Sequence, residues 1–533
     1  MEFDYNSFIH QYLFVMQLGV FLVAAGIASF EFQSKKTISL ILLVLGALAL
    51  RIFVSLIDPF LHLWDEQFHA LVAKNMMINP FKPTLLIDPI LSYDYKFWPS
   101  NHVWLHKQPL FLWQIALSFK LFGINEFTLR LPSLIMSAIM VFFTYRIGYI
   151  SFNKRAGFYA AVLFTGSNFL IELASGRINT DHNDIAFLFY ITASIWAWFE
   201  YSKSKRKYWI LVIGLFSGFA ILVKWLTGLL VYSGWFISII AIKKSREQRQ
   251  NYMALLKSLI ITIIVALPWQ IYILIRFPKE SAYEFGLNSR HFFKAVEAHG
   301  GNWLFHFDKI KDIYGVNFEY LIYSSIFIFL FIKVKKKFKI AILTWILAVF
   351  IFFSIAATKM IAFTIIVSPL VYVIIGIVMA FLFDSFKNQF ANQSLKRWLP
   401  SILSLVITFF LFFNFLNHEK LTLQNTQKRK KVYQNKIKEV IVFKELKSLL
   451  PDDNFIIFNT RDTEYVKIIF YTNYRSRKEI PSKENIINLK KQNINIAVFD
   501  NKKLPDYILN DKEIIKIKST IWDKSLPLKP TIY

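Results

Sequence analysis

Apolar runs of about twenty residues recur along most of the chain and alternate with polar connections. A helix of that length crosses the hydrocarbon core of a bilayer. The runs lie near residues 9–30, 37–57, 128–148, 157–175, 184–201, 208–223, 226–243, 256–275, 316–333, 338–357, 360–383 and 397–416. This pattern predicts an all-α polytopic membrane protein with about twelve transmembrane helices, several of them short.

Two long polar intervals, residues 58–127 and 276–315, separate some of these runs. The first is dense in Asp, Glu, His, Lys, Trp and Tyr, and such a segment cannot lie in hydrocarbon. We therefore expect both intervals to be loops at the membrane surface, and the first to be the active-site loop.

The composition changes after about residue 418, where the last apolar run has ended. A basic stretch, 428–438, leads into short strand-like segments at 455–458 and 494–499, with amphipathic segments between them. This predicts a small soluble α/β domain over 418–533, following a transmembrane domain over 1–417. Because the small domain has no Gly-rich phosphate loop and no recognisable catalytic set, we expect it to have a supporting role.

The formal net charge of +27 has two interpretations, binding of nucleic acid or contact with anionic lipid headgroups. Lys and Arg gather in short clusters at every second connection between apolar runs, which favours contact with lipid. If those connections are cytoplasmic, both termini and both long loops lie on the outer side. The sequence thus predicts an integral protein of the cytoplasmic (inner) membrane, with its active site outside and no nucleic-acid partner.

The chain contains no Cys, which excludes disulfides, thiol catalysis and Cys-ligated metal. Its first apolar run follows the acidic residues Glu2 and Asp4 instead of a basic segment. No cleavable signal peptide is therefore predicted.

An acidic pair, Asp65 and Glu66, stands at the predicted start of a short helix in the first loop. Acidic residues stabilise a helix N-terminus, so one interpretation is a cap on an interfacial helix. The other is a general base at the outer membrane boundary, where a lipid-linked substrate and a water-soluble one meet. We favour the second interpretation and predict that the pair is catalytic.

Further along the same loop, His106 and Lys107 precede Gln108 and Pro109. A fixed lysine at a membrane interface suits a lipid phosphate. A lysine that only snorkels to the interface is the structural alternative.

The connection S-G-R-I-N-T-D-H-N-D offers Arg177, Asp181 and Asp184. Arg177 and Asp181 are four residues apart and could pair on one helical face, which would be structural. Asp181 or Asp184 could instead bind a hydroxylated acceptor or position Asp65, and the sequence does not choose between the two.

Lys224 lies between two segments that are short for a straight span, so we expect its side chain to point into a cavity instead of snorkelling. Arg290 and His291, in the second long loop, are phosphate-contact candidates by charge and side. A divalent-cation site built from His102, His106 and His299 is conceivable. No tight ligand spacing of the H-E-x-x-H kind supports it, so no metal ligands are assigned.

An ordered set of motifs resembles a known family. It comprises D-E in a long first outer loop, K-x-P-L, N-E-F-x-x-R-L-P-S (125–133), Tyr145-Arg146, V-K-W-L-T-G (223–228) and Thr358-Lys359 followed by Pro369. The set, over roughly residues 38–385, resembles the dolichyl-phosphate-mannose protein mannosyltransferase family. The closest similarity is to its bacterial branch, which includes the lipid A aminoarabinose transferase.

The resemblance implies a C-type glycosyltransferase fold and transfer of a sugar from a polyprenyl phosphate to a protein, lipid A or glycan acceptor. Asp65 takes the family's catalytic aspartate position, Lys107 takes the position that contacts donor phosphate, and Lys359 joins the substrate-binding residues. The chain departs from the family at His106, often acidic there, and at Gln108, where a second proline is usual. These departures bear on the sugar and on any metal site.

A third departure is Phe363, where some relatives have Tyr, and an additional helix, 9–30, precedes the family's first.

These observations predict an inverting transferase in which Asp65 deprotonates the acceptor and Lys107 stabilises the departing polyprenyl phosphate. The alternative from another class is a transporter or flippase. It would place polar residues near mid-membrane, with an internal repeat, and we find no repeat. A member of the family that binds the lipid without transfer is a third possibility, against which Asp65 and Lys107 argue.

Overall fold

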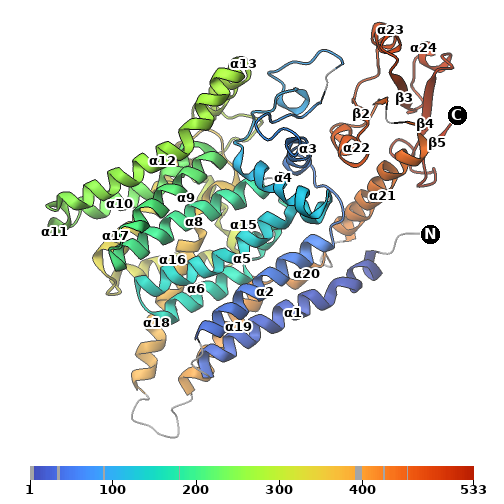
Figure 1. Cartoon of the computed structure of the whole chain (residues 1–533). Coiled ribbons are helices and arrows are strands. Elements are labelled where there is room, and N and C mark those ends of the chain that lie inside the picture. The colour runs from blue at the N-terminus through green and yellow to red at the C-terminus, as the bar shows by residue number, and fades with distance from the viewer. Residues whose placement is uncertain are drawn as a thin grey trace.

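The computed structural model describes residues 5–32, 36–87, 90–178, 181–389, 399–423, 427–452 and 454–533. Most of the described chain is helical, and the long helices lie side by side in one bundle (Figure 1). The helices of the bundle are α1 (Tyr5–Phe32), α2 (Lys36–Leu56), α5 (Glu126–Ser151), α6 (Lys154–Gly166), α7 (Asn168–Ala174), α8 (Asp181–Ser204), α9 (Tyr208–Lys224), α10 (Leu230–Ile240), α12 (Arg249–Arg276), α16 (Phe318–Phe331), α17 (Lys336–Ile355), α18 (Ser368–Gln389) and α19 (Leu399–Phe415). Every apolar run singled out in the sequence falls on one or more of these helices.

By length and composition, 8 helices of the described residues could cross a membrane, or up to 10 if each bent pair is one span. This is fewer than the predicted twelve or so. One reason is that α9 and α10, predicted as separate spans, form a single candidate, Tyr208–Ile240, joined by the 3-10 helix η2 (Trp225–Leu229). The other difference is α8, which begins with polar residues and is not among the candidates. The predicted fold class, a helical membrane protein, is confirmed.

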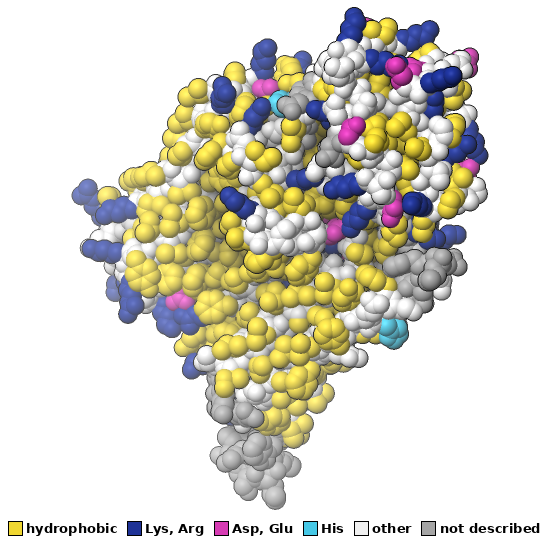
Figure 2. All heavy atoms as spheres, turned by 45° about the vertical axis from the view of Figure 1, so that its right-hand side comes forward, with side chains coloured by type: hydrophobic (Ala, Val, Ile, Leu, Met, Phe, Trp, Pro, Cys, Tyr) yellow, Lys and Arg dark blue, Asp and Glu magenta, His cyan; other side chains and the backbone are white. Residues whose placement is uncertain are grey.

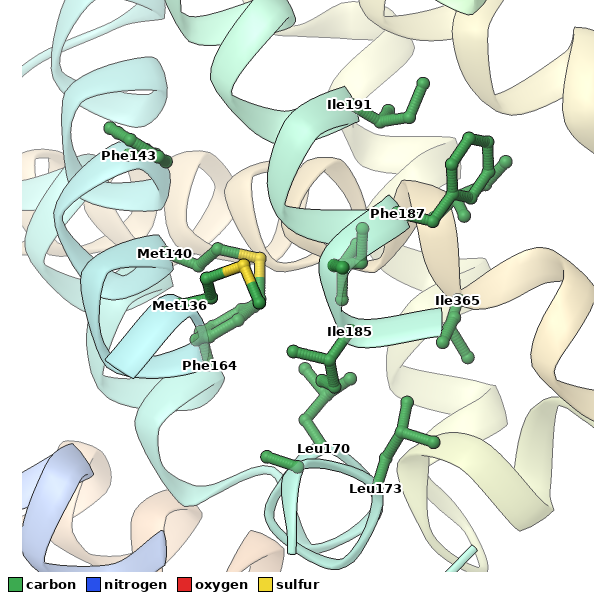
Figure 3. Close-up of a cluster of buried hydrophobic side chains, with 14 of the residues drawn as sticks. Met136, Met140, Phe143, Phe164, Leu170, Leu173, Ile185, Phe187, Ile191 and Ile365 are labelled. Atoms are coloured by element: carbon green, nitrogen blue, oxygen red, sulfur yellow. The ribbon is translucent and has the colours of Figure 1, made fainter. Parts of the chain in front are cut away.

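The interior of the bundle is packed with large apolar side chains from helices distant in sequence. Met136 and Met140 of α5, Phe164 of α6 and Ile185 of α8 lie close together in Figure 3, and all are 7% exposed or less. Apolar side chains cover much of the face drawn in Figure 2, with Lys and Arg gathered at its edges. An apolar exterior with basic margins fits a helical bundle surrounded by lipid.

The two predicted loops contain helices of their own, at one end of the bundle. The first holds α3 (Asp65–Met76), the short 3-10 helix η1 (Trp98–Ser100) and α4 (Leu110–Phe122). The second holds α13 (Pro278–Phe293), α14 (Phe305–Asp308) and α15 (Ile310–Tyr314). Figure 1 shows α3 between the bundle and the C-terminal region, so the interval that carries Asp65 is packed on both sides.

The C-terminal region forms a five-stranded sheet in the order β2-β1-β3-β4-β5. Its strands are β1 (Phe455–Phe458), β2 (Arg475–Ser476), β3 (Asn495–Phe499), β4 (Ile514–Lys518) and β5 (Thr531–Ile532), of which only β5 is antiparallel to its neighbour. The associated helices are α20 (His418–Leu421), α21 (Gln427–Leu449), α22 (Glu464–Thr472), α23 (Lys483–Lys491) and α24 (Asp506–Leu509). The predicted strands at 455–458 and 494–499 are thus present in a small α/β unit.

This α/β unit rests on the helix that carries the acidic pair. Gln67 of α3 donates to the Thr463 hydroxyl at 2.6 Å, and the Lys74 ammonium donates to the carbonyls of Ile469 and Phe470 at 3.0 and 2.7 Å. The Lys74 bonds satisfy carbonyls at the C-terminal end of α22, where a helix favours a cation. The sheet is therefore fixed against α3 by specific polar contacts as well as by apolar packing.

Candidate active site

Asp65 and Lys107 face each other across the first loop. Asp65 is the first residue of α3, and Lys107 lies just before α4; Nζ of Lys107 is 3.4 Å from Oδ2 of Asp65. Their side chains are 17% and 21% exposed, so both are reachable from outside the protein core. The residue at the N-cap of α3 is Trp64, and no side chain caps this helix end. Asp65 is therefore paired with Lys107, and no side-chain hydrogen bond supports the capping interpretation.

A second lysine–carboxylate pair lies nearby, where α8 begins and α9 ends. Nζ of Lys224 is 2.5 Å from Oδ1 of Asp184, and the same ammonium lies 5.1 Å from the centre of the Phe363 ring. The Asp184 side chain is 3% exposed, and its second oxygen is buried without a hydrogen bond. Lys224 is thus paired with a buried carboxylate while its side chain stays 27% exposed, and its expected direction into a cavity stays a prediction.

Electrostatics joins the two pairs into one cluster, Asp65–Lys107–Asp184–Lys224. Burial alone would lower the pKa of Lys107, but the negative charges of Asp65 and Asp184 raise it above its ordinary value. Lys107 is therefore a firmly protonated cation with acidic groups on two sides. A cluster of two ammonium and two carboxylate groups can bind an anion and accept a proton in the same place.

Glu66 occupies a different environment from its neighbour, and this corrects the predicted catalytic role. Its carboxylate is fully buried and accepts two bonds from Arg130, at 2.7 and 3.1 Å, and one from the backbone N–H of His62, at 2.5 Å. Burial opposes ionisation of Glu66, yet the charge of Arg130 holds its pKa well below the usual range. A carboxylate so enclosed and paired cannot touch a substrate in this arrangement, so Glu66 is a positioning residue.

Arg130 and Gly176 together fix the position of the buried Glu66 carboxylate. Besides Glu66, the Arg130 guanidinium binds the backbone carbonyls of Ser55, Asp58 and Phe60, which fixes the chain where it leaves α2. Gly176 has φ +82°, and a Cβ there would collide with the Glu66 carboxylate. Arg130 was part of the N-E-F-x-x-R motif, but its role as the partner of Glu66 was not predicted.

Arg177 is also structural. Its guanidinium forms a two-pronged pair with Asp58, at 2.7 and 3.0 Å, and donates to the Leu421 carbonyl at 2.7 Å. Both side chains of the pair are 0% exposed. Arg177 was also expected to bind substrate, but its pairing with the buried Asp58 favours a structural role.

Lys359 is similarly occupied. Its ammonium donates to the carbonyls of Phe353, Ser354 and Ala356, at 2.9, 2.6 and 2.5 Å, which lie at the C-terminal end of α17. The residue is 4% exposed. It caps a helix instead of facing a substrate, which corrects the substrate-binding role that the resemblance implied.

His106 lies behind Lys107, against a buried acid that the sequence did not reveal. Its ring stacks on Trp98, with centroids 4.5 Å apart, and its Nδ1 is 3.4 Å from Oε2 of Glu284. Burial raises the pKa of Glu284 to about 7, although the charge of Lys107 opposes this, and burial lowers the pKa of His106 to about 3. Both groups are therefore neutral between about pH 3 and pH 7.

Arg290 and His291 end α13, close to the same region. His291 Nδ1 is 3.1 Å from the Thr358 hydroxyl, and burial lowers its pKa while Lys107 adds to the effect. Arg290 is exposed, contacts the Gly286 carbonyl at 3.3 Å and lies over Tyr283. His291 thus belongs with the cluster, whereas the Arg290 guanidinium faces outward.

The side chain of Asp181 lies outside the described residues. Among the described residues, no group of three or more His, Asp or Glu is arranged to hold a metal ion. The Nδ1 atom of His102 lies 2.5 Å from the Leu86 carbonyl oxygen. The conceivable set His102, His106 and His299 is therefore not assembled as a ligand group.

Comparison with known proteins supports the assignment that the motifs suggested. Residues 106–272 match the family described as dolichyl-phosphate-mannose-protein mannosyltransferase. The chain is similar to this glycosyltransferase family. The predicted resemblance is confirmed, and the matched segment includes Lys107, Arg130, Asp184 and Lys224.

Solved structures of membrane glycosyltransferases share the fold. ArnT from Cupriavidus metallidurans bound to undecaprenyl phosphate superposes with a TM-score of 0.60 at 12% identity, covering 92% of this chain and 97% of that one. The oligosaccharyltransferase of Archaeoglobus fulgidus gives a TM-score of 0.55 at 12% identity, covering 83% of this chain and 64% of that one. At these identities the likeness concerns the fold.

A sequence relative from Aquifex aeolicus (strain VF5), an uncharacterised protein, is 25% identical over 186 residues. The match covers 34% of this chain and 34% of that protein. The chain thus matches about a third of that relative's length, and the relative's own description adds no activity.

Proposed function

We propose that this protein is an inverting glycosyltransferase that moves a sugar from a polyprenyl-phosphate donor to an acceptor. The observation that carries the proposal is the partly exposed Asp65–Lys107 pair beside Asp184 and Lys224. The family match over residues 106–272 and the fold shared with ArnT support it. Both Asp65 and Lys107 lie outside the candidate spans. This position suits catalysis at a membrane surface, whereas a transporter would need polar residues near mid-membrane.

In the proposed reaction, Asp65 accepts the proton of an acceptor hydroxyl or amine as that group attacks the anomeric carbon. The bond between this carbon and the phosphate oxygen breaks, and the polyprenyl phosphate leaves with the electron pair. Lys107 neutralises the charge that develops on the phosphate, so binding the donor exchanges its contact with Asp65 for one with the phosphate. Attack from the face opposite the leaving group inverts the configuration.

Lys224, His291 and Asp184 complete the proposed site. Lys224 supplies a positively charged donor near Lys107, and His291 supplies a neutral one. Asp184, whose second oxygen is buried without a hydrogen bond, orients Lys224. Glu66 acts through Arg130 by fixing the N-terminal turn of α3, which sets the position of Asp65. The residues that touch substrate are thus Asp65, Lys107 and Lys224.

The site is proposed to face the outer side of the cytoplasmic membrane, with the C-terminal α/β unit on the same side. The basic clusters at alternate connections support that orientation. The acceptor class is a protein, a glycan or a lipid such as lipid A, and the α/β unit, packed on α3, borders the route by which an acceptor reaches Asp65.

The proposal is tested by incubating the purified protein in lipid nanodiscs with a panel of polyprenyl-phosphate sugars and following release of free polyprenyl phosphate. Release that depends on Asp65 with at least one donor is expected. If every donor remains intact while the donor lipid still binds, the protein would instead be a member of the family that binds the lipid without transferring a sugar.

A further inference from the structure

A cavity of about 430 Å³ lies between α3, the loop that follows it and the edge of the C-terminal sheet. It lies at the opposite end of α3 from Asp65. Lys74, which lines it, comes nine residues after Asp65 in the helix, roughly 13 Å along the axis. The cavity is therefore separate from the Asp65–Lys107–Asp184–Lys224 cluster.

One side of the cavity is apolar. Ile78, Ile87, Ile90 and Ile124 line it, and Ile78, Ile87 and Ile124 are 83%, 48% and 42% exposed. A volume of several hundred cubic ångströms with a mainly apolar lining and few polar groups is typical of a small-molecule or lipid site. Isoleucines this exposed at the mouth of a cavity favour an apolar occupant.

The opposite side is basic. Arg475 and Arg477, on and beside the edge strand β2, line the cavity together with Lys74. Arg475 donates to the neutral Asn454 amide oxygen at 3.3 Å, and neither arginine lies within ion-pair distance of a carboxylate among the described residues, although the charge of Glu479 acts on Arg477. Burial lowers the pKa of Arg477, and burial lowers the pKa of Lys74 to about 8. Cations held in this way are stabilised by an anion.

One edge of the cavity lies beside a helix that is long and apolar enough to cross a membrane. Ile124 lies two residues before α5, which is long and apolar enough to span. The preceding turn of α4 presents Leu121 and Phe122, 63% and 61% exposed, so an apolar path leads from the mouth of the cavity to the outer end of a spanning helix. Figure 1 shows α22 and β2 beside α3 and α4 at this end of the bundle.

We propose that this cavity binds an anionic membrane lipid, with the phosphate against Arg475 and Arg477 and hydrocarbon against the isoleucines. Bound in this way, the lipid ties the C-terminal α/β unit to α3 and to the membrane surface. The site lies apart from the donor site, and it does not depend on the proposed transferase activity.

The test measures lipid binding, not sugar transfer. Native mass spectrometry of the purified chain with dioleoyl phosphatidylglycerol and dioleoyl phosphatidylcholine is expected to show stronger retention of the anionic lipid. The double substitution Arg475→Gln and Arg477→Gln is expected to weaken phosphatidylglycerol binding about tenfold or more. The matched control, Lys512→Gln with Lys524→Gln, removes the same charge from exposed positions of the same unit and is expected to bind like the unchanged chain.

A variant with minimal risk to the fold tests the apolar side. Ile124→Glu places a carboxylate at an exposed position of the mouth and is expected to lower phosphatidylglycerol binding with an unchanged melting temperature. Equal retention of both lipids, or equal phosphatidylglycerol binding by the double variant, would overturn the proposal. So would displacement of the lipid by inorganic phosphate at matching concentration, because the apolar side would then contribute nothing.

The principal rival occupant is a peptide that pairs with the edge strand β2. A benzophenone amino acid at position 124 distinguishes the two in native membranes. A lipid adduct supports the proposal, and a peptide adduct in place of lipid refutes it.

Discussion

Lys107 holds its ammonium 3.4 Å from the carboxylate of Asp65, across a loop that separates them widely in sequence. The pair remains partly exposed, whereas the adjacent Glu66 is sealed beneath Arg130. The two neighbouring acidic residues therefore differ in role: Asp65 faces the site, and Glu66 fixes the start of α3, which carries Asp65.

Asp65→Asn keeps the size of the side chain and removes its ability to accept a proton. We expect transfer to fall by about 10²- to 10⁴-fold, the usual contribution of a general base. Because no side-chain cap depends on Asp65, the melting temperature should change little. Transfer assays and thermal melting in detergent check both statements, and normal transfer by this variant would refute the mechanism.

Lys107→Met retains much of the apolar stem and deletes the charge. Charge-assisted contacts contribute about 1.5 to 3 kcal/mol, so transfer should fall roughly ten- to a hundredfold. Donor binding should weaken in parallel, measured as retention of a polyprenyl phosphate. The control is Lys120→Met, in the last turn of α4, which should behave like the unchanged protein. Equal donor binding and turnover in Lys107→Met would make this lysine an interfacial anchor.

Glu66→Gln leaves Arg130 without its buried counter-charge. Breaking a buried pair typically costs about 3 to 5 kcal/mol, so this variant should melt well below Asp65→Asn. Gly176→Ala should resemble it, because the added methyl group meets the Glu66 carboxylate and the backbone there has positive φ. Normal melting of Glu66→Gln with strongly reduced transfer would instead return Glu66 to a catalytic role.

Glu284 predicts a pH dependence of stability. Its pKa is raised from 4.5 to about 7 by burial, so between these values the folded state binds more protons than the unfolded state. The contribution of Glu284 to stability is full below about pH 4.5, is lost as the pH rises to about 7, and amounts to roughly 3 kcal/mol.

Glu284→Gln should remove this dependence. The melting temperature of the unchanged protein, taken relative to the variant, should decline between pH 5 and pH 7 and then level. A constant difference across that range would mean that the buried Glu284 carboxyl is already ionised.

The proposed orientation predicts which positions are accessible from outside the cell. The chain has no cysteine, so single cysteines at Ser100, Asn288, Ser482 or Ser204 are unique. The first three should react with a membrane-impermeant thiol reagent in spheroplasts, and Ser204→Cys should react only after permeabilisation. Labelling of Ser204→Cys without labelling of Ser100→Cys would invert the orientation.

The sequence by itself determined the helical membrane fold, the two polar loops, the small α/β unit and the resemblance to the mannosyltransferase family. These follow from local properties: the length of apolar runs, their periodicity and the order of short motifs. It also singled out Asp65 and Lys107, because a charged residue at the membrane surface is conspicuous in so apolar a chain.

Only the tertiary structure decided what each charged residue does. In the sequence, Arg177 and Lys359 are basic residues near predicted helix ends, as Lys107 and Lys224 are. In the structure, Arg177 pairs with Asp58 and Lys359 caps α17. Glu284 could not be identified from the sequence, because its burial depends on the packing of α13 against His106. The reason is physical: the role of a charge depends on its desolvation and its partner, and both are set by contacts between segments far apart in the chain.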